Sequence, residues 1–161
     1  MTRMHETRID LAEEVRDKLV GVLNQQLADV FDLYSQTKQA HWNVKGTDFI
    51  QLHELFDEIA TAVLPHVDLI AERATTLGGT ALGTARMAAG TSSLAEYPED
   101  AVDGMAHVRA LADRYGAFAK SARAAIDTAD DLGDQDTADL FTEVSRDIDK
   151  HLWFLEAHLQ A

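Results

Sequence analysis

The chain has 161 residues, enough for one domain with a sizeable hydrophobic core, and no cysteine, which excludes disulfides and thiolate metal sites. Its 28 acidic and 14 basic residues give a net charge of −14, which repels nucleic acid and anionic membranes and suits cations, although acidic soluble proteins are also common. No stretch approaches the roughly 20 apolar residues of a membrane-spanning helix, and the polar start is unlike a secretory signal, so we expect one cytoplasmic domain over residues 1–161.

The first half of the chain is predicted to form two long helices. After a tail of about residues 1–8, apolar residues recur at helical spacing from about residue 10 to residue 41. Asp48 is a candidate N-cap for a second helix, and the Gly78-Gly79 pair ends it. The Lys45-Gly46-Thr47-Asp48 segment permits a turn that folds the first helix back alongside the second.

The second half is predicted to contain two more long helices. Pro98, followed by two acidic residues, is typical of a helix start, which predicts a third helix from there to about Asp131. Gly133 ends that helix, and a fourth is expected from about Asp134 to Leu159.

A long connection separates the second predicted helix from the third. Residues 80–97 are weakly patterned, with room for one short helix near 83–89. Four long helices with a single long crossover between the second and third predict an all-α, ferritin-like four-helix bundle.

Four metal-type side chains lie on one face of the predicted second helix. His53 and Asp57 are four residues apart, and so are Asp68 and Glu72. A helix turns about 100° and rises about 1.5 Å per residue, so all four fit an arc of roughly 100°. The centres of the two pairs are nevertheless roughly 22 Å apart along the axis, whereas bonds from a ligand to a metal are about 2 Å long. A single ion cannot contact both pairs of one straight helix.

A twofold dimer would bring the two pairs together. If two copies of the helix pack antiparallel, the His53/Asp57 end of one meets the Asp68/Glu72 end of the other, which produces two equivalent sites. This mixture of imidazole and carboxylate ligands suits iron. His41 reaches the site only if the chain before residue 47 folds back alongside. Acids at this spacing are also typical of a solvated face, but this stripe borders apolar residues, where carboxylates need partners.

Two familiar metal motifs are absent from the sequence. His53-Glu54-Leu55-Phe56-Asp57 departs from the zinc-protease motif at its last position, which requires histidine. No glutamate has a histidine three residues later, so the Glu-x-x-His pair of an intrabundle di-iron centre is missing. His66 lies about 220° from His53 around the helix and is expected to face elsewhere.

Several other residues allow two interpretations. Trp42, beside His41, is either a packing anchor or an oxidisable ring next to a metal centre, whereas Trp153 is most simply part of the bundle core. Six aspartates where the third helix ends and the fourth begins form either a capping region or an acidic mouth that draws cations inward where several copies meet. They are Asp127, Asp130, Asp131, Asp134, Asp136 and Asp139.

The combined motifs resemble the Dps family, the mini-ferritins of bacteria and archaea, over roughly residues 20–160. The first family motif is matched by Lys38-Gln39-Ala40-His41-Trp42-Asn43 with Gly46 and Phe49, and His53 and Asp57 follow at the family spacing. The second is matched by Asp68-Leu69-Ile70-Ala71-Glu72-Arg73 and Leu77-Gly78-Gly79. The similarity continues in Ala112-Asp113-Arg114-Tyr115 and Asp136-Thr137-Ala138-Asp139.

The resemblance implies a hollow shell of twelve subunits with ferroxidase centres at its dimer interfaces. The implied ligands are His41, His53 and Asp57 of one chain with Asp68 and Glu72 of its neighbour, and all five positions hold the expected residue type. In the family, ferrous iron is oxidised there, preferably by hydrogen peroxide, and stored as a ferric mineral, which protects the cell from oxidative damage. The acidic cluster falls where the family has its iron-entry pores.

The same family suggests a DNA-compacting, nucleoid-associated protein as the alternative. Many members bind DNA through a mobile tail rich in Lys and Arg, whereas here Arg3 and Arg8 are balanced by Glu6 and Asp10, and the sequence ends at Ala161 soon after the last predicted helix. Phosphate contacts dominate DNA affinity, so we expect weak or no DNA binding. A third hypothesis is a metal-free bundle whose acids are merely solvated.

Overall fold

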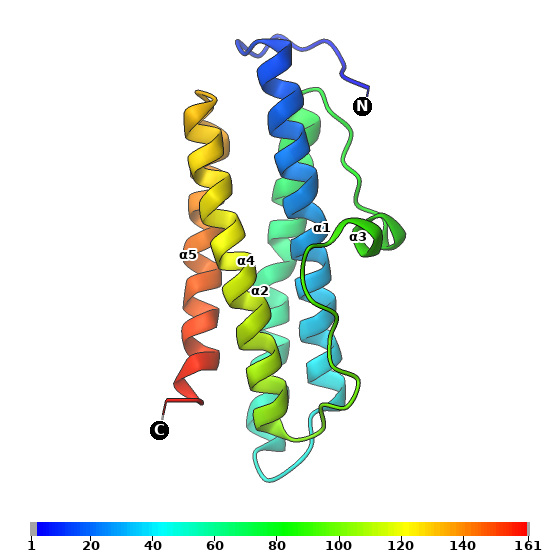
Figure 1. Ribbon diagram of the computed structural model, residues 1–161, viewed down its shortest axis with the longest axis vertical. Coiled ribbons are helices and arrows are strands. Elements are labelled where there is room, and N and C mark those ends of the chain that lie inside the picture. Colours follow the sequence, from blue (N-terminus) through cyan, green and yellow to red (C-terminus); the bar gives the residue numbers. More distant parts are fainter. Residues whose placement is uncertain (1–2, 161) are drawn as a thin grey trace.

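The computed structural model describes residues 3–160, and these residues form five helices (Figure 1). The helices are α1 (Glu13–Asn43), α2 (Phe49–Thr76), α3 (Ala85–Thr91), α4 (Gly104–Asp131) and α5 (Gln135–Ala157). No helix in this part of the chain is long and apolar enough to cross a membrane. The all-α prediction is confirmed, while the first two residues of the predicted tail and Ala161 lie outside the described residues.

The four long helices form a bundle in which α1 packs mainly on α2 and α4 mainly on α5. Figure 1 shows these helices aligned along the long axis, with the connection between α2 and α4 running beside α1 and carrying α3. This arrangement is the ferritin-like bundle expected from the sequence. The short extra helix predicted near 83–89 is α3.

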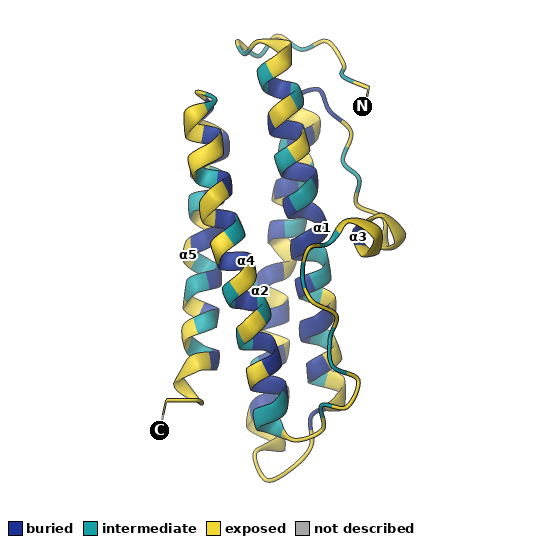
Figure 2. Cartoon of the chain, viewed as in Figure 1, coloured by how far each residue is buried: buried dark blue, intermediate teal, exposed yellow. Residues whose placement is uncertain are grey.

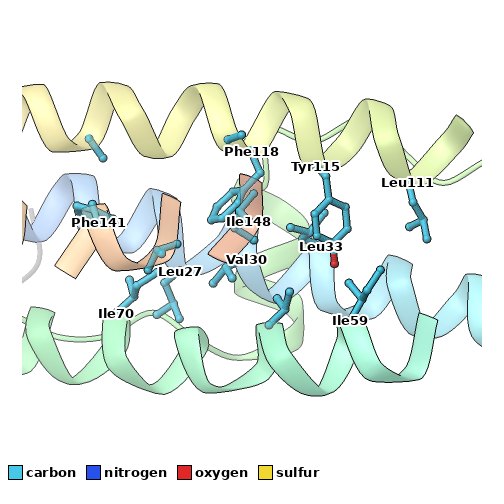
Figure 3. Close-up of a cluster of buried hydrophobic side chains, with 14 of the residues drawn as sticks. Leu27, Val30, Leu33, Ile59, Ile70, Leu111, Tyr115, Phe118, Phe141 and Ile148 are labelled. Atoms are coloured by element: carbon cyan, nitrogen blue, oxygen red, sulfur yellow. The ribbon is translucent and has the colours of Figure 1, made fainter. Parts of the chain in front are cut away.

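The hydrophobic core lies between the four long helices (Figures 2 and 3). Burying each large apolar side chain contributes about 1.5–3 kcal/mol relative to exposure. The labelled core residues come from all four helices: Leu27, Val30, Leu33, Ile59, Ile70, Leu111, Tyr115, Phe118, Phe141 and Ile148. The outer faces of the same helices are exposed, so each helix is amphipathic, as the periodicity predicted.

The third long helix begins later than predicted. α4 starts at Gly104 rather than near Pro98, and its N-cap is Asp103, whose carboxylate accepts a 3.0 Å hydrogen bond from the backbone N–H of Ala106. The backbone before it pairs instead with the turn between α1 and α2, because Lys45 N–H donates to the Val102 carbonyl at 3.1 Å. A tertiary contact therefore outweighs the local helix-start signal.

Buried polar side chains of α1 hold the crossover in place. The Asn24 amide donates to the Thr80 carbonyl at 3.0 Å and accepts from the Leu82 N–H at 2.8 Å. Asp29, which is fully buried, accepts from the Ser93 N–H at 2.6 Å. These bonds satisfy crossover backbone groups that would otherwise be costly to bury.

The end of α2 is fitted to the segment that precedes α1. His5 N–H donates to the Gly78 carbonyl at 2.7 Å, and Arg16 Nη1 donates to the Leu77 carbonyl at 2.7 Å. Gly78 has φ of +87°, and a Cβ there would lie 2.5 Å from the His5 carbonyl oxygen. Only glycine therefore fits this position without displacing the N-terminal segment.

The acidic cluster between α4 and α5 includes one structural carboxylate. Asp134 caps α5 by accepting from the Thr137 N–H, and Arg73 Nη2 donates to it at 2.8 Å. Although burial opposes ionisation, these hydrogen bonds lower the pKa of Asp134 overall. The capping interpretation is confirmed for Asp134, whereas the other five aspartates are exposed.

Candidate metal centre

The turn between α1 and α2 brings His41 and His53 together. His41 lies in the last turn of α1 and His53 in the first turns of α2. Gly46, with φ of +116°, permits the reversal of the chain between them. The two imidazole rings stack with their centroids 3.8 Å apart and their planes inclined by 21°. The fold-back that His41 required is therefore present.

Each of these histidines holds the other in position. His41 Nδ1 lies 2.7 Å from the His53 carbonyl oxygen, and His53 Nδ1 lies 2.8 Å from the His41 carbonyl oxygen. A carbonyl only accepts, so both Nδ1 atoms must carry and donate a proton. In the neutral rings the lone pair is then on Nε2, which is the atom left to bind a metal. Hydrogen bonds of this kind fix the tautomer and orientation of metal-binding histidines.

Asp57 lies beside this pair as an ionised carboxylate. His41 Nε2 lies 3.9 Å from Asp57 Oδ1, and Lys38 Nζ lies 2.5 Å from the same oxygen. The hydrogen bond from Lys38 holds the pKa of Asp57 below its ordinary value, so the group is a carboxylate at neutral pH. A cation that binds Asp57 would either displace the Lys38 ammonium group or share the carboxylate with it.

A cleft opens over these residues. It has a volume of about 740 Å³ and is lined by polar and ligand-type side chains together with parts of α2. Besides the predicted His41, His53 and Asp57, the lining includes Glu54 and Glu58. Each of these glutamates directly follows a predicted ligand in the sequence, which is the signal that could have identified them. They make the cleft more acidic and so more attractive to cations.

Asp68 and Glu72 lie farther along α2 and do not line this cleft. Both are exposed, and the neighbouring Arg73 is directed to Asp134 rather than to either of them. Among residues 3–160, no three or more histidine or carboxylate side chains converge closely enough to hold one ion. The two groups of predicted ligands are thus separate within a single chain, in agreement with the helix geometry; that they form a metal site, and that two chains join them, stays a prediction.

Exposed apolar side chains lie on and beside the face of α2 that carries the predicted ligands. Phe49 is 42% exposed, Ile50 51%, Leu64 45% and Leu69 39%. Large apolar groups clustered on one face typically mark a surface that contacts another protein. Their interleaving with the ligand-type residues fits a contact between two copies of α2.

Both tryptophans are exposed in the single chain. Trp153 is 60% exposed, so its assignment to the bundle core was wrong, and Trp42 is 66% exposed, so it is not a packing anchor within the chain. His66 faces away from His53, as expected, and its Nε2 lies 2.8 Å from an Asp147 carboxylate oxygen on α5.

Comparisons with known proteins agree with this architecture. The family model of the ferritin-like domain matches residues 20–161. The DNA protection during starvation protein of Agrobacterium fabrum is 49% identical over 158 residues, covering 98% of each chain. DpsC from Streptomyces coelicolor superposes with a TM-score of 0.93 at 30% identity, covering 98% of this chain and 92% of that one.

The description of another similar solved structure names the chemistry of its superfamily. The DPS protein from Vibrio cholerae, described as a member of a broad superfamily of ferritin-like diiron-carboxylate proteins, has a TM-score of 0.90 and 29% identity, covering 99% of this chain and 100% of that one. The sequence similarity extends over nearly the whole chain, and both the helical bundle and the sequence motifs match those of these relatives. The chain therefore belongs to the Dps family of ferritin-like proteins.

Proposed function

We propose that this protein is a ferroxidase that oxidises ferrous iron and stores the ferric product. Family membership supports iron storage or DNA protection in general. The observation that carries the more specific proposal is the locked histidine pair, which leaves two Nε2 lone pairs beside an ionised Asp57 in an open acidic cleft. Neutral imidazoles with carboxylates form a donor set that binds ferrous iron and tolerates ferric iron.

Each complete centre would be formed by two chains. We assign His41, His53 and Asp57 of one chain and Asp68 and Glu72 of its neighbour to one site. The exposed apolar residues of α2 support this pairing, because they would be covered in the same contact. We further propose that such dimers assemble into a closed shell of twelve chains, and that the exposed aspartates between α4 and α5 line the entry for iron.

The proposed reaction uses hydrogen peroxide as the preferred oxidant. Two ferrous ions give up one electron each, and one peroxide is reduced to two hydroxide ions, so no hydroxyl radical is released. The ferric ions then pass into the shell as mineral. Iron is the substrate and cargo of the protein in this proposal, and the activity would protect a cytoplasm from iron and peroxide together.

Anaerobic loading with ferrous ion followed by peroxide tests this function. We expect fast formation of ferric absorbance, consumption of one peroxide for every two ferrous ions, and a soluble assembly whose mass rises with the iron added. Protein-free buffer is the control, since there the ferric product precipitates. Oxidation no faster than in buffer, or ferric product that does not remain with the protein, would contradict the proposal.

DNA protection in this protein would then come from removing iron and peroxide rather than from binding DNA. A net charge of −14 per chain is multiplied in any assembly, and His5, in the segment before α1, donates a backbone hydrogen bond to the Gly78 carbonyl. Phosphate contacts need basic side chains, so we expect plasmid to migrate unretarded in a gel-shift assay at low salt without divalent cations. Tight retention of plasmid under those conditions would favour the DNA-compacting alternative.

A further inference from the structure

A tyrosine and a histidine outside the candidate metal centre form a close acid–base pair. The hydroxyl oxygen of Tyr97, in the crossover, lies 2.6 Å from His107 Nδ1, in the first turns of α4. The two rings are also nearly parallel, with centroids 5.9 Å apart and planes inclined by 17°. Nothing in the proposed iron chemistry uses this pair.

The surroundings favour the phenol as the donor and the imidazole as a neutral acceptor. His107 is 1% exposed, and burial lowers its pKa, which the nearby Asp103 only partly opposes. Burial likewise raises the pKa of Tyr97, so the phenol keeps its proton at rest. A neutral imidazole next to a protonated phenol is a base poised to take that proton.

A second tyrosine, which is fully buried, differs from Tyr97 in its hydrogen-bond partner. Tyr115 is fully buried, and its hydroxyl lies 3.0 Å from the hydroxyl of Thr37. A hydroxyl is a very weak base, so Tyr115 has no partner that could hold its proton. This difference matters for oxidation, because a tyrosine that loses an electron becomes a very strong acid and must release its proton at once.

Tyr97 is also accessible from outside the bundle. It lines a cleft of about 560 Å³ beside α1, and Trp42 lines the same cleft. Trp42 follows His41 of the candidate metal centre directly in the chain. Small oxidants can therefore reach the phenol through a cleft that an oxidisable indole also lines.

We propose that Tyr97 and His107 form a one-electron donor site that quenches strong oxidants. One electron leaves the phenol, the O–H bond breaks, and the proton moves to His107 Nδ1, which leaves a neutral phenoxyl radical and an imidazolium. With hydroxyl radical as the oxidant, the electron converts it to hydroxide. Such radicals arise wherever a single ferrous ion meets peroxide, so the natural source of oxidant depends on the proposed iron chemistry, but the donor site itself does not.

Photochemical oxidation of the iron-free protein tests this site without any iron. The probe is tris(bipyridine)ruthenium(III) generated by a laser flash, with radicals trapped by freezing and identified by electron paramagnetic resonance. We expect a neutral tyrosyl signal in the wild type, and Tyr97→Phe should lose most of it. Tyr115→Phe removes a more deeply buried hydroxyl that has no base and should keep the signal; circular dichroism checks that each variant is folded.

A second variant tests the role of the base. His107→Gln keeps a polar side chain but cannot become a cation, so we expect tyrosine oxidation to slow by about 100-fold, the lower range for a positioned proton acceptor. The wild-type rate should fall in heavy water, and the variant rate should not show the same dependence. An undiminished tyrosyl signal in Tyr97→Phe, a signal from tryptophan alone, or an unchanged rate in His107→Gln would each overturn the proposal.

Discussion

Replacing His53 with glutamine should slow peroxide-driven ferrous oxidation by at least about 100-fold, because losing even an outer partner of a metal ligand costs about 10- to 100-fold. The change removes one Nε2 ligand and also the ring that stacks on His41. The glutamine side chain keeps approximate size and polarity, so the bundle should stay folded. Stopped-flow absorbance of the ferric product gives the rate, and size-exclusion chromatography gives the state of assembly.

The contact between His41 and His53 leads us to a more specific prediction, about a variant in which both histidines are replaced. Each ring donates to the backbone of the other, so each depends on the other for its orientation. We expect His41→Gln combined with His53→Gln to be slower than either single variant by no more than about threefold, since groups that act as a unit are strongly non-additive. A double variant whose loss of rate equals the product of the two single losses would contradict this mutual orientation.

A third histidine serves as the matched control. His158 Nδ1 also bonds to a backbone carbonyl, that of Phe154 at 2.7 Å, but it is exposed and far along the chain from the proposed ligands. His158→Gln should oxidise iron at the wild-type rate. An equal loss in this variant would mean that histidine replacement acts through general damage and not through the proposed centre.

The sequence was a good guide to features that depend on local periodicity. The four long helices, the crossover with its short helix and the stripe of ligand-type residues on α2 all follow from apolar spacing and from glycines at element ends. His41 could be placed only conditionally, on a fold-back at Lys45–Asp48 that the structure shows, and it was named as a ligand by the family resemblance. These features involve residues that are neighbours in the chain or on one helix.

Other features depended on contacts between distant segments. The start of α4 was predicted too early, because nothing near Pro98 shows that the following backbone pairs with the turn at Lys45. The Lys38–Asp57 ion pair joins two helices, so no spacing rule reveals it. Trp153 was wrongly assigned to the core, since residue type does not distinguish a side chain buried within one chain from one available to contact another copy.

Two inactive variants should restore activity when they assemble together, and this result would test the shared site directly. The first variant carries His53→Gln and Asp57→Asn, and the second carries Asp68→Asn and Glu72→Gln. In a mixed dimer, one site combines both damaged sides, but the other combines both intact sides. A site confined to one chain could not be rescued in this way.

The expected size of the rescue follows from the same symmetry. Random pairing makes half of the dimers mixed, and each mixed dimer has one intact site of two, so co-expression in equal amounts should give about one quarter of the wild-type rate per chain. Distinct affinity tags on the two variants allow mixed assemblies to be purified and their composition measured. Each variant expressed alone should show almost no ferroxidase activity.

A co-expression control separates complementation from general stabilisation. His41→Gln paired with the His53→Gln/Asp57→Asn variant damages the same side in both chains, so every possible site is defective and no rescue should occur. Activity in that control, full activity of the Asp68→Asn/Glu72→Gln variant alone, or no recovery in the first mixture would each contradict a centre shared between chains. The exposed apolar residues near the two ligand groups of α2 favour recovery, because an antiparallel contact that brings the His53 end of one α2 to the Glu72 end of the other would cover them as well.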